Sequence, residues 1–178
     1  MPVKSPDDYF ALFNLTPVFD VNPAELATRY RELQRIVHPD RFAAASDAER
    51  LRAVRRAAEV NDAFQTLKDP VRRARYLLEL KGVDTDDETD TVMDPAFLME
   101  QLELRERLEQ AQSREGAARA QALASLREAF MHRFDETTRA FEAAFAHAHD
   151  LAAARARVRE LQFLRKLIDQ VDSAGEET

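Results

Sequence analysis

The sequence contains no cysteine, no tryptophan and only three glycines among its 178 residues. Without cysteine, the chain cannot form a disulfide, bind a metal through thiolates or use a thiol as a nucleophile. Residues 1–13 lack the apolar core of a signal peptide, and no apolar run is long enough to span a bilayer. We therefore expect a cytoplasmic protein that works without a membrane, a metal or a resident cofactor.

The residues that are abundant favour helix. Hydrophobic residues make up 45% of the chain and charged residues 33%, and leucine, alanine, glutamate and arginine dominate. These residues are strong helix formers, whereas glycine, which disfavours helices, is scarce. The composition predicts an all-α protein with one or two small domains.

Charge is distributed unevenly along the chain. Residues 1–80 carry 13 basic and 12 acidic side chains, a net charge of +1, whereas residues 81–178 carry 13 basic and 21 acidic side chains, a net charge of −8. The two halves should therefore meet differently charged partners. Nucleic acid is not expected as a ligand of the acidic half.

Helix start and stop signals divide the N-terminal part into four expected helices. Asn22 and Pro23 form a cap followed by a first-turn proline, and Pro39 prevents that helix from continuing past His38. The segment 46–49 has the pattern of a capping box. These signals predict helices near 9–13, 23–38, 46–68 and 71–80, with the second and third antiparallel, in a domain that spans residues 1–81.

An acidic segment separates this domain from a second one. Residues 83–91 are polar and almost without apolar side chains, so we expect a linker over 82–94. Asp94 and Pro95 then supply another cap and first-turn proline. Three helices are expected, at about 95–112, 116–147 and 150–172, and they should pack as a three-helix bundle in a domain that spans residues 95–178.

The tripeptide His38-Pro39-Asp40 lies between the two long N-terminal helices. Alone it is weak evidence, because histidine is common at helix C-termini and Pro-Asp at turns. Its context is more specific: Tyr30-Arg31-Glu32-Leu33 precedes it, and residues 61–73, which end in an Asp-Pro-x-x-Arg pattern, follow it. In this order the motifs resemble the J-domain family.

That resemblance implies that the tripeptide contacts the ATPase domain and linker of a heat-shock-type partner chaperone. Asp40 would engage an arginine of the partner, while Pro39 shapes the turn and His38 orients it. A basic surface could steer docking onto an acidic chaperone surface; it consists of Arg29, Arg31, Arg35 and Arg41. The alternative for these arginines is an ordinary solvated helix face.

Two features depart from general members of the J-domain family. Arg41 stands where many J-domains have lysine, which keeps the charge but not the compact ammonium. The glycine-rich and cysteine-rich zinc modules of general DnaJ-type chaperones are missing from the sequence. Their absence favours a dedicated client over broad client handling.

Helical-wheel positions separate the apolar residues of segment 95–112 into two sets. At about 100° per residue, one stripe starts at Phe97 and should face the bundle; its other members are Gln101, Leu104 and Leu108. A second arc mixes apolar and acidic residues, which a core would not accept; it consists of Leu98, Met99, Leu102, Glu103, Glu106 and Glu109.

The last expected helix also offers an apolar residue outside its stripe. Phe163 lies well off the centre of the stripe formed by Leu161, Leu164, Leu167, Ile168 and Val171, and is interpreted as a surplus aromatic. An apolar patch rimmed by acids is typical of a protein-binding surface. The alternative is a bundle that packs on two faces or against the first domain.

The segment 97–106 closely resembles the C-terminal domain of the bacterial HscB iron–sulfur cluster co-chaperone family. Residues 8–10 and 161–164 extend the resemblance over nearly the whole chain. It implies an all-α, L-shaped protein in which an N-terminal J-domain precedes a C-terminal three-helix bundle. It also implies that the chain stimulates the ATPase of the chaperone HscA and delivers the scaffold protein IscU to it.

By the same resemblance, IscU would bind through Leu98, Met99, Leu102, Glu103, Glu106 and Phe163. Without cysteine, the chain would not ligate the iron–sulfur cluster through thiolates of its own. Two alternatives remain open: a J-domain co-chaperone with a different dedicated client, and a structural helical adaptor.

An enzyme is a weaker alternative, because four histidines and many carboxylates form no ordered nucleophile–base arrangement. A metal site at His147-Ala148-His149-Asp150 is also disfavoured, since residues two apart do not share a helix face. We interpret that segment as a solvated helix end.

Overall fold

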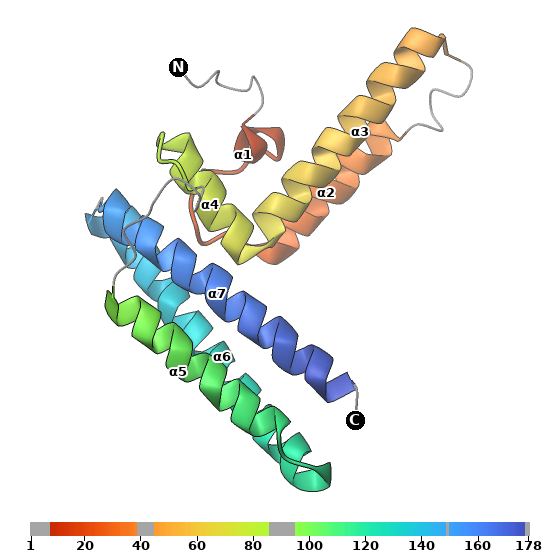
Figure 1. Ribbon diagram of the computed structural model, residues 1–178. Coiled ribbons are helices and arrows are strands. Elements are labelled where there is room, and N and C mark those ends of the chain that lie inside the picture. The colour runs from red at the N-terminus through yellow and green to blue at the C-terminus, as the bar shows by residue number, and fades with distance from the viewer. Residues whose placement is uncertain (1–7, 39–44, 86–94, 149, 177–178) are drawn as a thin grey trace. The chain divides into compact units, whose positions relative to one another are not determined.

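The computed structural model describes residues 8–38, 45–85, 95–148 and 150–176, and within these ranges it is helical without strands (Figure 1). The predicted all-α class is confirmed. The chain forms two compact units, unit 1 at residues 1–83 and unit 2 at residues 84–178. Unit 1 contains α1 (Tyr9–Leu12), α2 (Pro23–Val37), α3 (Asp47–Lys68) and α4 (Pro70–Leu80).

Side-chain caps fix where the long helices of unit 1 begin. The Asn22 side chain accepts hydrogen bonds from the backbone N–H groups of Ala24 and Glu25, at 3.0 and 3.2 Å, and Pro23 occupies the first turn of α2. Ser46 and Glu49 form the predicted capping box of α3. Each cap satisfies N–H groups that have no partner within the helix.

The helices α2 and α3 form an antiparallel hairpin (Figure 1). The rings of Tyr30 and Phe64 stack with their centroids 4.0 Å apart, and the Tyr30 hydroxyl donates to Oδ1 of Asn61 at 2.9 Å. The buried apolar side chains of the two helices are small or branched, namely Leu26, Val37, Ala53, Val60, Ala63 and Leu67. These contacts fix the packing of α2 against α3 and so the place at which α2 ends.

A cluster of aromatic residues joins the short helix α1 to α3 and α4. The rings of Tyr9 and Tyr76 stack at 4.6 Å, and Phe10 beside them is fully buried. The Tyr9 hydroxyl donates to Asp62 at 2.6 Å, while the Tyr76 hydroxyl donates to Asp8 at 3.2 Å and accepts from the Tyr9 N–H at 2.9 Å. Residues at the two ends of unit 1 are thus held together.

These tyrosines should make unit 1 sensitive to alkaline pH. Burial, with the nearby Asp8 carboxylate, raises the pKa of Tyr76 from its ordinary 10.0 to about 12, and the hydrogen bond to Asp62 raises the pKa of Tyr9. Because the folded state holds both protons more tightly than the unfolded chain, their contribution to stability is complete below about pH 10 and declines as the pH rises toward about 12.

The test is urea unfolding followed by tyrosine fluorescence, which reports on unit 1 because all three tyrosines lie there. Tyr76→Phe should reduce the loss of unfolding free energy between about pH 9 and pH 11, relative to the wild type. Equal losses in the two proteins would show that the phenol of Tyr76 is not responsible.

Unit 2 is a bundle of α5 (Pro95–Gln112), α6 (Gly116–Glu142) and α7 (Leu151–Glu176), in which α6 and α7 form the longest contact (Figure 1). Apolar side chains of both helices fill their interface, among them Phe130, Phe141, Leu161 and Leu167. The predicted boundaries of α5 and the start of α6 are confirmed, and α7 continues to Glu176, beyond the expected end near 172.

The end of α6 differs from the expected regular helix. Residues Ala143–Ala148 form a π-helical segment, η3, in which Phe145 is buried and stacks on Phe141 with centroids 5.6 Å apart. The wider turn ends where the Asp150 N–H donates to the Ala144 carbonyl at 3.0 Å. The Asp150 side chain then accepts from the Ala153 N–H at 2.9 Å and begins α7.

Candidate functional site

The signature tripeptide begins where α2 ends. Val37 is the last residue of α2, and His38 is its exposed C-terminal cap with φ −59° and ψ 127°, so the backbone leaves the helix at the predicted position. Pro39, Asp40 and Arg41 lie outside the described residues. Of the predicted chaperone-binding loop, the structure therefore places His38 alone.

The predicted basic residues of α2 do not all share one face. Arg31 and Arg35 are four residues apart and both exposed, whereas Arg29 projects elsewhere and pairs with Glu25 at 3.6 Å. Arg31 Nε also donates to the Ala27 carbonyl at 3.2 Å. Arg31 and Arg35 thus share one exposed face of α2, and Arg29 lies on the opposite side.

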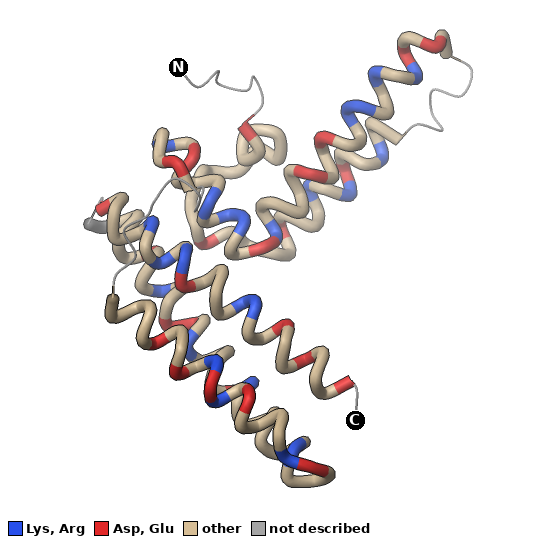
Figure 2. The backbone as a smooth tube through the Cα atoms, viewed as in Figure 1, with Lys and Arg blue, Asp and Glu red and all other residues tan. Residues whose placement is uncertain are grey.

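Basic residues also line α3, outside the predicted chaperone-binding set (Figure 2). Arg52 and Arg55 are exposed near its N-terminal end, one turn apart. Their three-residue spacing, in a predicted helix that follows the tripeptide, could have indicated this second basic surface. Positive charge therefore occurs on both helices of the hairpin that carries the loop.

The predicted division of α5 into a stripe that faces the bundle and an exposed arc is confirmed. Phe97, Gln101 and Leu104 are half-buried and Leu108 is buried, as expected for the stripe that faces the bundle. The other arc is exposed: Leu98 is 39% exposed, and Met99 and Leu102 are each 59% exposed. Glu103 and Glu106 are exposed on the same arc. We call this set of five the α5 face.

The interpretation of Phe163 as a surplus surface aromatic is wrong. Phe163 is only 8% exposed, because α5 packs across it. The Phe97 ring meets it edge-on with centroids 6.1 Å apart, and the Arg105 guanidinium lies 5.6 Å from its ring centroid. Phe163 thus supports the helix that carries the α5 face and adds little exposed surface of its own.

One ion pair joins the N-terminal half of α5 to α6, and a second one lies beside it within α7. Glu100 accepts from Arg133 of α6 at 3.0 Å, and the Glu160 carboxylate of α7 accepts from Arg157 at 2.6 and 2.8 Å. Burial raises the pKa of Glu160, although Arg157 and Arg133 oppose the shift. The Glu100–Arg133 pair, together with the Phe97–Phe163 contact, fixes which side of α5 points outward.

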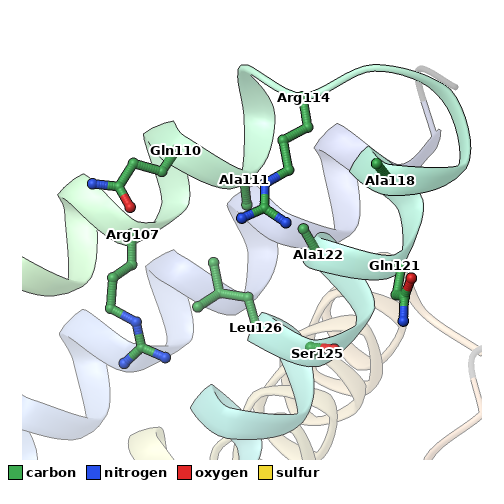
Figure 3. Close-up of a pocket in the computed structure, with 9 residues that line it drawn as sticks. All are labelled: Arg107, Gln110, Ala111, Arg114, Ala118, Gln121, Ala122, Ser125 and Leu126. Atoms are coloured by element: carbon green, nitrogen blue, oxygen red, sulfur yellow. The ribbon is translucent and has the colours of Figure 1, made fainter.

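A cavity of about 480 Å³ lies between α5 and α6, on another side of α5 (Figure 3). The Arg114 side chain extends from the interhelical turn toward Ala111 and Ala122, and Arg107 lies farther along the cavity. Ser125 is the only hydroxyl in the lining, which contains no histidine or acid.

Metal-binding clusters and membrane-spanning helices are both absent from the described residues. No group of three or more histidine, aspartate or glutamate side chains there is placed to hold a metal ion. The side chains of His147 and His149 are outside the described set. None of the described helices is both long and apolar enough to cross a membrane.

Comparison with known proteins assigns both halves of the chain. A family model described as the DnaJ domain matches residues 8–76, and one described as the HSCB C-terminal oligomerisation domain matches residues 93–172. The curated "Co-chaperone protein HscB homolog" of Shewanella amazonensis is 49% identical over 169 residues, which cover 94% of this chain and 96% of the relative. Its counterpart in Shewanella sp. strain ANA-3 is 45% identical over 166 residues, covering 92% and 94%.

Solved structures agree with this assignment. The chaperone HscB from Vibrio cholerae matches with a TM-score of 0.84 and 38% identity, covering 96% of this chain and 99% of that one. The human co-chaperone HscB matches with a TM-score of 0.85 and 30% identity, covering 96% and 83%.

A DnaJ-type helical hairpin joined to a separate three-helix bundle defines a J-domain co-chaperone, a class of protein that regulates a partner chaperone. The matches cover both halves of the chain and therefore identify one family within this class. This chain belongs to the HscB co-chaperone family.

Proposed function

We propose that this chain serves iron–sulfur cluster assembly, by bringing the scaffold protein IscU to the chaperone HscA and stimulating ATP hydrolysis there. The observation that carries the proposal is the α5 face, an exposed apolar patch with an acidic rim in the bundle of an HscB family member. Such a patch is what a partner of opposite charge and matching apolar surface recognises. The setting is the cytoplasm.

On the chaperone side, the loop His38-Pro39-Asp40 contacts the ATPase domain and linker of HscA. Asp40 engages an arginine of the chaperone, which forms a strong charge-assisted hydrogen bond. Positive charge around the loop steers the encounter with an acidic surface; it comes from Arg29, Arg31, Arg35 and Arg41. The antiparallel packing of α2 and α3 supports this role, because it anchors the helix that ends at His38.

On the scaffold side, Leu98, Met99 and Leu102 form the apolar centre and Glu103 and Glu106 form the acidic rim. Phe163 acts from beneath by holding α5 in place. The matching surface of IscU must offer apolar side chains bordered by basic ones. We assign residues 82–94 as the linker between the J-domain, residues 1–81, and the scaffold-binding domain, residues 95–178.

The acidic rim gives a direct test. Replacing Glu103 and Glu106 together by lysine should weaken IscU binding by about tenfold at low salt, because rim charges set long-range attraction, and the difference should shrink as salt is added. Calorimetric titration of purified IscU into each protein measures the affinities.

A control pair is available on α6. Glu128 and Asp135 are exposed, and their replacement by lysine changes the net charge by the same amount. The control pair should bind IscU nearly as the wild type does. If it loses as much affinity as the rim pair, total charge rather than the α5 face is responsible.

A further inference from the structure

One side of the α5 face leads into a groove between α5 and α7. Leu98, Leu102, Arg105 and Glu109 follow one another at helical spacings of four, three and four residues, so they lie along one side of α5. A groove of about 490 Å³ begins at Arg105 and is lined by 11 residues of α5 and α7. Phe163, which lies beneath α5, is also part of its lining.

The groove has an apolar floor and charged edges. Leu108, Phe163 and Leu167 form the floor, with exposed fractions of 5%, 8% and 1%. On the α7 side, Lys166 and Gln170 are four residues apart and exposed. Lys166 forms no ion pair with any residue in the described ranges.

The α5 face by itself is small for a protein–protein interface. A standard interface takes roughly 20 to 30 residues from each partner. The α5 face provides Leu98, Met99, Leu102, Glu103 and Glu106, whereas the adjoining groove is lined by 11 residues. The surface that continues directly from the α5 face is therefore the natural place for the rest of the contact.

We propose that the scaffold-binding surface continues from Leu102 into the α5–α7 groove, where it receives a second segment of the same scaffold protein. This inference rests on the proposed function and extends it to residues of α7. The segment places an apolar side chain over Phe163 and Leu167 and an acidic side chain against Lys166. Lys166 and Gln170 are then contact residues for the scaffold.

Two exposed positions test the groove without disturbing the core. Lys166→Glu should weaken IscU binding about fivefold at low salt, and the difference should narrow at high salt, because it reverses a charge at the edge. Gln170→Trp should weaken binding about tenfold at any salt concentration, because the larger side chain occupies the groove. The measurement is calorimetric titration of purified IscU into the full chain.

Arg139→Glu is the matched control, since Arg139 is exposed on α6 and the substitution makes the same charge change as Lys166→Glu. It should bind IscU as the wild type does. If Lys166→Glu and Gln170→Trp both bind normally while Leu98→Ala binds weakly, the groove proposal is overturned and the proposed function stands. If Leu98→Ala also binds normally, both the groove proposal and the proposed function are overturned.

Discussion

Simultaneous replacement of Leu98, Met99 and Leu102 by alanine should weaken IscU binding about a hundredfold or more and leave the helical fold intact. These side chains are 39%, 59% and 59% exposed in the free chain, so their truncation removes little packing within unit 2. In a complex each would lose most of its contact with water. At about 25 cal/mol per Å² of apolar surface, this contributes about 1 to 1.5 kcal/mol per residue.

A matched control for this variant exists in unit 1. Ile36, Leu51 and Val54 are also large apolar side chains, with exposed fractions of 59%, 52% and 51%. Their replacement by alanine removes a similar amount of exposed apolar surface and should leave the affinity for IscU unchanged in a calorimetric titration. Equal affinities for the two triple variants would contradict the assignment of the α5 face.

Phe163 is deliberately kept in the triple variant. Its ring is buried between Phe97 and Arg105, and removing a buried aromatic ring costs about 3 to 5 kcal/mol of folding stability. A loss of binding by Phe163→Ala would therefore mix a weakened bundle with a lost contact. Replacing only the exposed Leu98, Met99 and Leu102 changes the contact without weakening the bundle.

Local signals made most helix boundaries predictable. A cap acts within one turn, so Asn22 with Pro23, and Ser46 with Glu49, could be recognised from neighbouring residues alone. The exposed arc of α5 was predictable for a similar reason, because spacing along one helix decides which side chains share a face.

Features that depend on contacts between distant segments were not predictable. The burial of Phe163 depends on α5 packing across α7. A helical wheel of α7 alone carries no information about that contact. The hydrogen bond between Tyr9 and Asp62 joins residues 53 positions apart. The π-helical segment at the end of α6 has no recognisable signal in the sequence.

His38→Gln should reduce the stimulation of the HscA ATPase about tenfold or more. His38 is exposed at the end of α2 and is the first residue of the loop proposed to contact the chaperone, so its loss removes part of that contact. The hairpin itself is held by Tyr30, Phe64 and Asn61, away from the substitution. Unchanged tyrosine fluorescence and helix content would show that the variant is folded.

The most direct test of the whole account is ATP turnover by HscA, measured alone, with this chain, with IscU and with both. Wild type should raise the turnover, and IscU should raise it further. The Leu98, Met99 and Leu102 triple variant should keep the direct stimulation and lose the additional effect of IscU, while His38→Gln should give neither. Stimulation by His38→Gln equal to that by wild type would contradict the account.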